Sequence, residues 1–399
     1  MLADRQQFSS ILGKTFSILA LLLHVSCGYN SGPGLKRHDL FEIHLGTLPG
    51  QMDWFYQAGF HLAGTADIKT RDGLVLVSGG ETGKLMVFNS YGDLLTYVYN
   101  KERNPALASS ESGEGNRSIS RWPFRSMRSI ASYDDGFLVD DGVEPERRIA
   151  DAEFGAFYDR VVLRFSQNGE YLGHLGKEGL GGSPFPYIST IDVREDGGIV
   201  VTCRTPDMWL SYWYSKEGHP ITTVRIQEEQ LPVLQEGVNI AVYSVRPDPV
   251  EWTLHIRLDV YPGDAEGNRP DPRLYTLNLS GLQYSEPIIL PYSTASKEKD
   301  VPAVPPDYLG TTVGGIHVML APEGFETYRL TLVDGKGRII QNRRLRIDAD
   351  TTVYRQFYVQ NDGLLTGIFV GSDGATVSWW RVDKLIRDKK ISSTEIRSR

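Results

Sequence analysis

The chain has 399 residues, of which 40% are hydrophobic and 23% charged, and its net charge at pH 7 is −8. That apolar share is enough for a core. The negative balance argues against nonspecific binding to the phosphates of nucleic acid, so we expect no nucleic-acid partner. The 41 glycines and 20 tyrosines, with few long helical patterns, indicate strands and turns.

The N-terminus has the pattern of an export signal. Arg5 and Lys14 flank a polar n-region, and the apolar run Phe16 to Val25 that follows is shorter than the ~20 residues of a membrane-spanning helix. The following residues, Leu23 to Gly28, resemble a bacterial lipoprotein lipobox, although His24 departs from it. The resemblance implies that Cys27 is lipidated and becomes the mature N-terminus. It places the exported protein on a bacterial cell membrane, in the outer membrane or the periplasmic leaflet. Ordinary signal cleavage, with Cys27 unmodified, is the alternative.

The stretch from Asp67 to Tyr99 reads as four short strands joined as a meander. Its first turn, Asp72-Gly73, recurs as Asp-Gly at 135–136, 196–197 and 362–363. Its second turn has an apolar residue, a short polar residue, two further residues and a glycine, and it recurs at 88–92, 165–169, 214–218 and 333–337. Glycine takes a positive φ without steric cost, which closes such a turn between antiparallel strands.

This repetition predicts an all-β fold, a six-bladed β-propeller of four-stranded antiparallel blades. The six units run roughly over residues 62–100, 124–175, 186–228, 238–291, 309–348 and 352–387. The sixth is one strand short, and we expect the N-terminal segment Leu40 to Leu45 to supply that strand and close the ring. The predicted organisation is a lipoprotein signal peptide (1–26), a tether (27–38), the propeller (39–387) and a polar C-terminal tail (388–399).

The third unit carries the most detailed pattern. A glycine-rich lead-in begins at Tyr171-Leu172-Gly173, Pro184-Phe185-Pro186 follows it, and two strands then flank Asp196-Gly197. This order resembles NHL-type six-bladed propellers of bacterial envelope lipoproteins. The resemblance covers residues 40–387 in outline and the first three blades in detail. The polar motif that this family has after the second strand is not preserved at Thr202-Cys203-Arg204.

Both recurring turns fall on one edge of a meander, so the remaining connections must emerge on the opposite face. The longest of them span 101–122, 140–159, 174–186, 262–272 and 291–307. Aromatic and arginine side chains on such loops suit a protein partner, and the alternative is that they fold the loops onto the blades. The candidate partner-binding residues are Trp122, Phe124, Arg147, Arg148, Phe154, Phe157, Tyr158 and Trp209.

Several patterns that could carry chemistry favour structural interpretations. The segment Gly79 to Lys84 is one residue short of a phosphate-binding loop and no helix follows, so it is interpreted as a strand connection. The pairs Asp134-Asp135 and Asp140-Asp141 are interpreted as two solvated turns around a strand, because their spacing fits no calcium loop.

Aspartate, histidine and cysteine side chains are the other candidates for a metal site. Asp67 and Asp192 lie on first strands, which line a propeller channel, but at different offsets from their Asp-Gly turns, so we expect them to face different directions. The histidines show no metal-binding spacing, and Cys203 is expected to be a small buried residue. We therefore predict no catalytic residue, no metal ligand and no cofactor.

These patterns favour a lipid-anchored cell-envelope propeller that acts as a non-catalytic binding or assembly scaffold through the loops on one face. The expected partner is another envelope protein or peptide. The alternative is a periplasmic metal-dependent hydrolase or lactonase with its site at the central channel. The oligomeric state does not follow from these patterns.

The anchor can be tested directly. Cys27→Ala removes the only atom that could carry the lipid in the lipobox pattern, so the variant should move from the membrane fraction to the soluble fraction of fractionated cells. Unchanged retention in the membrane fraction would contradict lipidation at this residue.

Overall fold

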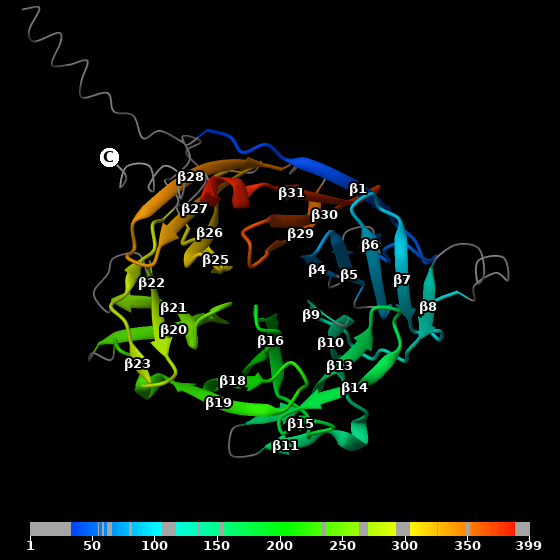
Figure 1. The fold of residues 1–399 in the computed structure, drawn as a ribbon, viewed down its shortest axis with the longest axis horizontal. Helices are drawn as coiled ribbons and strands as arrows, with labels where there is room; N and C mark the ends of the chain where they lie inside the picture. The colour runs from blue at the N-terminus through cyan, green and yellow to red at the C-terminus, as the bar shows by residue number, and fades with distance from the viewer. Residues whose placement is uncertain are drawn as a thin grey trace, which may run out of the picture.

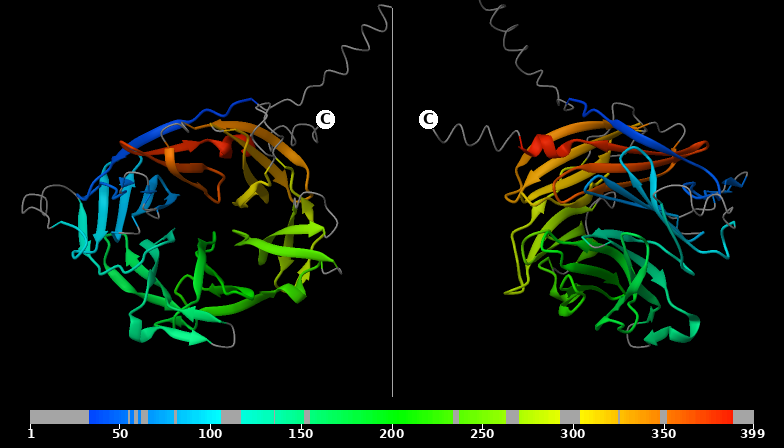
Figure 2. Two further views of the ribbon diagram at one scale, coloured as in Figure 1. Left: turned by 180° about the vertical axis from the view of Figure 1, so that it is seen from behind. Right: turned by 45° about the vertical axis from the view of Figure 1, so that its right-hand side comes forward.

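In a computed structural model the described residues are 33–54, 56–57, 60–61, 66–79, 82–105, 117–134, 136–151, 155–233, 237–262, 270–292, 304–324, 326–347 and 352–387. They form a ring of six small antiparallel sheets around a central axis, a six-bladed β-propeller (Figure 1). The predicted fold class is therefore confirmed. Figure 2 shows the same ring from behind and turned by 45°.

The first three blades follow one another along the chain, each with its first strand nearest the axis (Figure 1). Blade 1 has β4 (Ala66–Arg71), β5 (Leu74–Gly79), β6 (Lys84–Asn89) and β7 (Leu94–Tyr99), and β8 (Ser118–Arg121) pairs in parallel with β7. Blade 2 has β9 (Ile130–Tyr133), β10 (Gly136–Gly142), β13 (Arg160–Ser166), β14 (Tyr171–Gly176) and β15 (Gly179–Leu180). Blade 3 has β16 (Tyr187–Val193), β17 (Ile199–Arg204), β18 (Met208–Tyr214) and β19 (Pro220–Gln227).

The remaining blades complete the circle. Blade 4 has β20 (Val238–Pro247), β21 (Thr253–Pro262), β22 (Asp271–Asn278), and the short β23 (Gln283–Tyr284) and β24 (Ile288–Ile289), which both pair with β22. Blade 5 has β25 (Asp307–Thr311), β26 (Ile316–Pro322), β27 (Thr327–Asp334) and β28 (Ile339–Arg346). Blade 6 has β29 (Thr352–Val359), β30 (Leu365–Gly371), β31 (Gly374–Trp380) and, from the other end of the chain, β1 (His38–His44).

The long connections contain short elements of their own. A two-stranded hairpin, β2 (Tyr56–Gln57) and β3 (Phe60–His61), follows β1. Between β10 and β13 lie the 3₁₀ turn η1 (Pro145–Arg147) and the hairpin β11 (Ile149–Asp151) and β12 (Ala156–Tyr158). A second 3₁₀ turn, η2 (Glu228–Gln230), follows β19, and residues 382–387 form a short helix. Within the described part of the chain, no helix is long and apolar enough to cross a membrane.

The strands are apolar on both sides because each blade lies between two others. In β5, Val75 and Val77 pack towards blade 6, whereas Leu76, which points the other way, packs towards blade 2. Equivalent layers of buried side chains join the other neighbouring blades. Cys203 is fully buried in the layer between blades 2 and 3, as predicted from its isolated place in a strand.

The recurring turns have the predicted backbone. Gly92, Gly169, Gly218 and Gly337 all have φ between 78° and 94°. At Gly92 a Cβ atom would lie 2.8 Å from the Cβ atom of Phe41 in β1, so only glycine lets the blade 1 turn approach this strand so closely.

Closure of the ring also follows the prediction. Residues from His38 to His44 pair antiparallel with residues from Trp379 to Gly374 of β31, with one bulge (Figure 1). The N-terminal strand thereby becomes the outermost strand of blade 6 and covers an edge that would otherwise be open to pairing.

A fully buried ion pair holds the segment after β1 against blade 1. The ammonium of Lys84, at the start of β6, lies 2.6 Å from a carboxylate oxygen of Asp53, and both side chains are 0% exposed. The same ammonium donates to the carbonyl oxygens of Gly46, Thr47 and Gln51, at 2.9–3.4 Å. Burial lowers the pKa of Lys84. β5 ends at Gly79 and β6 begins at Lys84, while residues 80 and 81 between them lie outside the described residues; Lys84 itself holds the segment after β1 in place.

Removing one half of this pair should be costly. Lys84→Met leaves the Asp53 carboxylate buried without its cation, and we expect the free energy of unfolding to fall by about 3–5 kcal/mol in urea titrations. The double variant Lys84→Met/Asp53→Leu, which buries no charge, should lose less than Lys84→Met alone. Lys101→Met, at an exposed lysine, is the control and should change stability by less than about 0.5 kcal/mol. A double variant no more stable than Lys84→Met would contradict the cost assigned to the unpaired Asp53 carboxylate.

Candidate functional site

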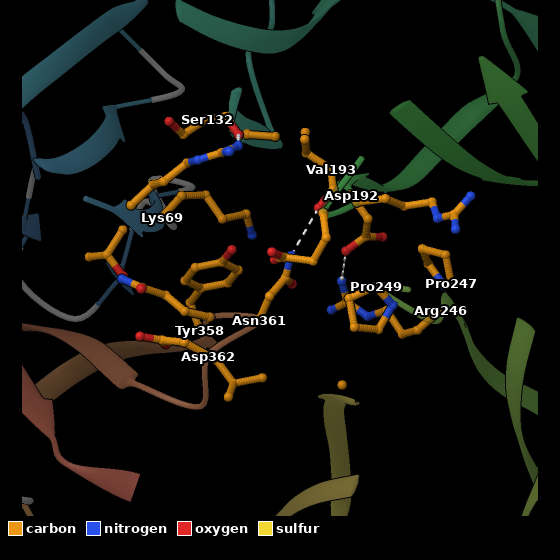
Figure 3. Close-up of a pocket in the computed structure, with 18 of the residues that line it drawn as sticks. Lys69, Ser132, Asp192, Val193, Arg246, Pro247, Pro249, Tyr358, Asn361 and Asp362 are labelled. Atoms are coloured by element: carbon orange, nitrogen blue, oxygen red, sulfur yellow. Dashed lines mark hydrogen bonds and ion pairs between the residues drawn. The ribbon is translucent and has the colours of Figure 1, made fainter. Parts of the chain in front are cut away.

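The two faces of the ring each have a hollow. The first, which we call the axial cavity, lies where the first strands of the blades end at the tight turns, and its volume is about 240 Å³. All six blades contribute to it, through residues that include Lys69, Ser132, Asp192, Arg246, Thr311 and Tyr358 (Figure 3).

The polar groups of the axial cavity bond to one another. Arg246 of blade 4 donates to Asp192 of blade 3 at 3.1 Å. Asn361, at the blade 6 turn, crosses to blade 3 and donates to Glu195 at 2.8 Å and to the Val193 carbonyl at 3.3 Å (Figure 3). The Lys69 ammonium lies 4.7 Å from the centre of the Tyr358 ring. These contacts link blades across the axis, so the residues that line the axial cavity mainly hold the blades of the ring together.

The two strand carboxylates considered for a channel metal have different partners. Asp67 is buried and accepts the backbone N–H of Ile130, from blade 2, at 3.1 Å. Asp192 instead faces the axial cavity and its arginine. Among the described residues, no group of three or more His, Cys, Asp or Glu side chains could hold a metal ion.

The second hollow, which we call the loop-face cavity, lies on the side of the long connections and has a volume of about 720 Å³. It is formed by the β10–β13 connection of blade 2, the start of β16 and the β17–β18 connection of blade 3, and the start of β20. Its lining includes Arg128, Phe157, Asp159, Arg160, Tyr187, Arg204, Asp207, Trp209 and Glu228. Aromatic and charged side chains therefore meet here.

A row of cationic and aromatic side chains crosses this cavity. Tyr187, Arg204 and Trp209 are direct neighbours across β16, β17 and β18, so they stand on one face of blade 3. The Arg204 guanidinium lies 5.5 Å from the Tyr187 ring centre and 5.9 Å from that of Trp209. Arg128, from blade 2, approaches Tyr187 at 5.0 Å. We call these four residues the arginine–aromatic row; cation–π attraction favours the positions of the guanidinium groups beside the rings.

A buried ion pair lies beneath the cavity and corrects one interpretation of the sequence. Asp140 and Asp141 are not solvated: they are 0% and 2% exposed. Arg160 donates to Asp140 at 2.7 Å, and to the hydroxyl and carbonyl of Ser126. Asp141 accepts the backbone N–H groups of Arg125 and Ser126. The two carboxylates tie the segment before β9 to β10 and hold Ser126 and Arg160, which line the cavity.

Two of the predicted partner-binding residues meet in the loop-face cavity. Phe157, in the β11–β12 hairpin, is 68% exposed, and Trp209 lies on blade 3. Arg147 and Arg148 are exposed on the same long connection but do not line the cavity. Cys27 and Phe154 lie outside the described residues.

Two other predicted partner contacts, Phe124 and Tyr158, require correction because their side chains are buried and fold the loops onto the blades. Phe124 is fully buried between blades 1 and 2, and Tyr158 is 7% exposed. Trp122 is half-buried and stacks on Tyr171, with ring centres 4.0 Å apart. Of these three, only Trp122 borders a surface hollow, and that hollow lies away from the loop-face cavity.

Arg128, Arg204 and Tyr187 are not among the candidate site residues predicted from the sequence. Arg204 stands where the family's polar motif is not preserved, and its opposition to Tyr187 follows from the register of β16 and β17. The strand register is the one feature that could have indicated Arg204 as a site residue. Arg128 comes from another blade, and no local pattern indicates its contact.

No protein-family model matches the chain, and no curated protein matches it. Solved structures similar to it include a PL25 ulvan lyase bound to -[GlcA(1-4)Rha3S]- (12% identity, 86% of this chain and 83% of that chain, TM-score 0.39). They also include the β-propeller domain of the Trilobed protease from Pyrococcus furiosus (10%, 80% and 83%, TM-score 0.38). A third is Trypanosoma rangeli sialidase with the inhibitor DANA (14%, 91% and 62%, TM-score 0.46). Similarities this remote carry no argument about function, and the NHL-type resemblance stays a prediction.

The stability of the protein should depend on pH through the buried carboxylate of Asp140. Burial raises the pKa of Asp140 to about 6, despite Arg160 beside it. Because the folded protein holds this proton more tightly than the unfolded chain, stability from this group is lost as pH rises from about 4 to about 6. In urea titrations, wild type should therefore lose about 2 kcal/mol relative to the non-titrating Asp140→Asn between pH 4 and pH 7. A constant difference between the two proteins over that range would contradict the prediction.

Proposed function

We propose that this protein is an exported, lipid-anchored propeller of the bacterial cell envelope that binds another envelope protein or peptide at its loop face. The N-terminal pattern around Cys27 supports export and anchoring, and the six-bladed ring supplies a rigid scaffold. In this arrangement the tether holds the ring near the membrane, and the long connections carry recognition.

The loop-face cavity is the observation that carries the proposal. It combines an exposed aromatic ring, Phe157, with the arginine–aromatic row in a hollow of about 720 Å³. Tyrosine, tryptophan and arginine are the residues that most often dominate the binding energy of protein interfaces. A partner side chain that entered the hollow would be surrounded by them.

The alternative function, hydrolysis at the channel, finds no comparable support. In the axial cavity Asp192 accepts from Arg246 and from Thr190, and Glu195 accepts from Asn361. These carboxylates are already engaged in contacts between and within blades, and such contacts explain them without a bound substrate. We therefore retain the binding function alone.

Substitution of the exposed ring tests the proposal. Phe157→Ser should lower partner recovery about tenfold when the mature protein is used as bait on detergent-solubilised envelope, because a central aromatic contact contributes more than 1 kcal/mol. Phe157 is already solvent-exposed, so the change should leave the fold intact. The matched control is Tyr91→Ser, at a ring that is 86% exposed on the β6–β7 turn of the opposite face. Equal recovery with both variants would overturn the proposal.

A further inference from the structure

The two arginines of the arginine–aromatic row have no protein acceptor among the described residues. A cation–π contact does not use the N–H donors of a guanidinium, which remain available for hydrogen bonds. Arg128 and Arg204 are both exposed, and within the described part of the chain neither side chain donates a hydrogen bond or forms an ion pair. Both groups are thus oriented by Tyr187 but not saturated.

Two other arginines show the contrast. Arg160, which lines the same cavity, donates to Asp140 and Ser126. Arg194, on the opposite face, lies 5.2 Å from the Trp213 ring centre and 5.5 Å from that of Trp252, but it donates to the Val250 carbonyl at 2.6 Å. Those two arginines serve the fold. Arg128 and Arg204, which have no acceptor among the described residues, line the loop-face cavity.

The charges around the row limit what can bind. Asp159, Asp207 and Glu228 line the same cavity, so its surface is mixed rather than uniformly basic. A chain with a negative group on every unit would meet these three carboxylates. A single carboxylate with a cationic group nearby would meet the arginines and the acidic side chains together, which is electrostatic complementarity of the kind that selects partners.

We infer that Arg128 and Arg204 form a seat for one carboxylate of the partner, an acidic side chain on a peptide segment that also carries basic residues. This inference rests on the proposed function and names the chemistry of its partner. The planar guanidinium fork matches a carboxylate, with two parallel N–H···O bonds, better than any other side chain. Tyr187 and Trp209 then form the walls beside the bound group.

A defined peptide pair tests the seat without knowledge of the natural partner. The probe is acetyl-Lys-Gly-Glu-Gly-Lys-amide, and its comparison is the same peptide with Gln in place of Glu. Binding of each to the intact mature protein is measured by ligand-observed NMR titration. We expect the Glu peptide to bind about tenfold more tightly than the Gln peptide, since a charge-assisted hydrogen bond is worth more than a neutral one.

Variants assign the effect to the two arginines. Arg204→Gln and Arg128→Gln should each weaken the Glu peptide about tenfold and leave the Gln peptide unchanged. Arg204→Lys should recover only part of the loss, because a lysine keeps the charge but not the planar fork. The control is Arg346→Gln, at an arginine side chain that is 80% exposed on blade 5, and it should have no effect on either peptide.

Three results would overturn the inference: equal binding of the two peptides, no detectable binding of the Glu peptide, or equal effects of Arg204→Gln and Arg346→Gln. Stronger Arg204-dependent binding of an oligogalacturonate, with a carboxylate on every sugar, would assign the seat to an acidic polysaccharide instead. Partner recovery with Phe157→Ser is measured separately. If it still falls while the peptides fail, the proposed function stands and only the carboxylate seat is lost.

Discussion

The pairing of β1 with β31 is the constraint on which the rest of the molecule depends. Each blade buries both of its faces against its neighbours, so the ring is stable only when the last blade is complete and meets the first. β1 completes blade 6 and also touches blade 1, where Phe41 lies against Phe88 with ring centres 5.2 Å apart. The Lys84–Asp53 pair then holds the segment that follows β1 on blade 1. The two blades that meet at the seam are therefore joined twice, once by a strand and once by a buried charge pair.

The two faces of the closed ring differ for a geometric reason. The tight turns of the blades converge at one end of the axis, where Asn361 of blade 6 can reach Glu195 of blade 3. That end is tied together by short polar contacts and has little freedom to vary. At the other end the connections are long, and the β11–β12 hairpin and the β17–β18 connection can leave a hollow between blades 2, 3 and 4. The loops at this end can therefore change to form a binding site without disturbing the contacts between blades 6 and 1.

The fold could be predicted from the sequence because its signals are local. Glycines such as Gly92 mark turns within five residues, and the alternation around Leu76 shows a strand buried on both sides. The site could not, because its contacts join distant residues. Asp140 has the composition of a solvated turn until Arg160, twenty residues later, is placed beside it. Trp122 and Phe157 are both loop aromatics, but only the first finds a ring, Tyr171, to stack on. The arginine–aromatic row could be predicted only with knowledge of two strand registers and of the position of a neighbouring blade.

The free arginine edges are difficult to explain as contributions to stability. A stacked guanidinium gains ~0.5–1 kcal/mol at an exposed site, and a lysine or a neutral side chain could cover Tyr187 at similar benefit. Two other arginines, Arg160 and Arg194, have protein acceptors within the fold. Asp159, Asp207 and Glu228 line the same cavity, yet the described structure forms no ion pair between them and Arg128 or Arg204. Carboxylates and guanidiniums held apart around one hollow are matched by a ligand that carries both charges, and the rigidity of the blade 3 sheet keeps that separation fixed.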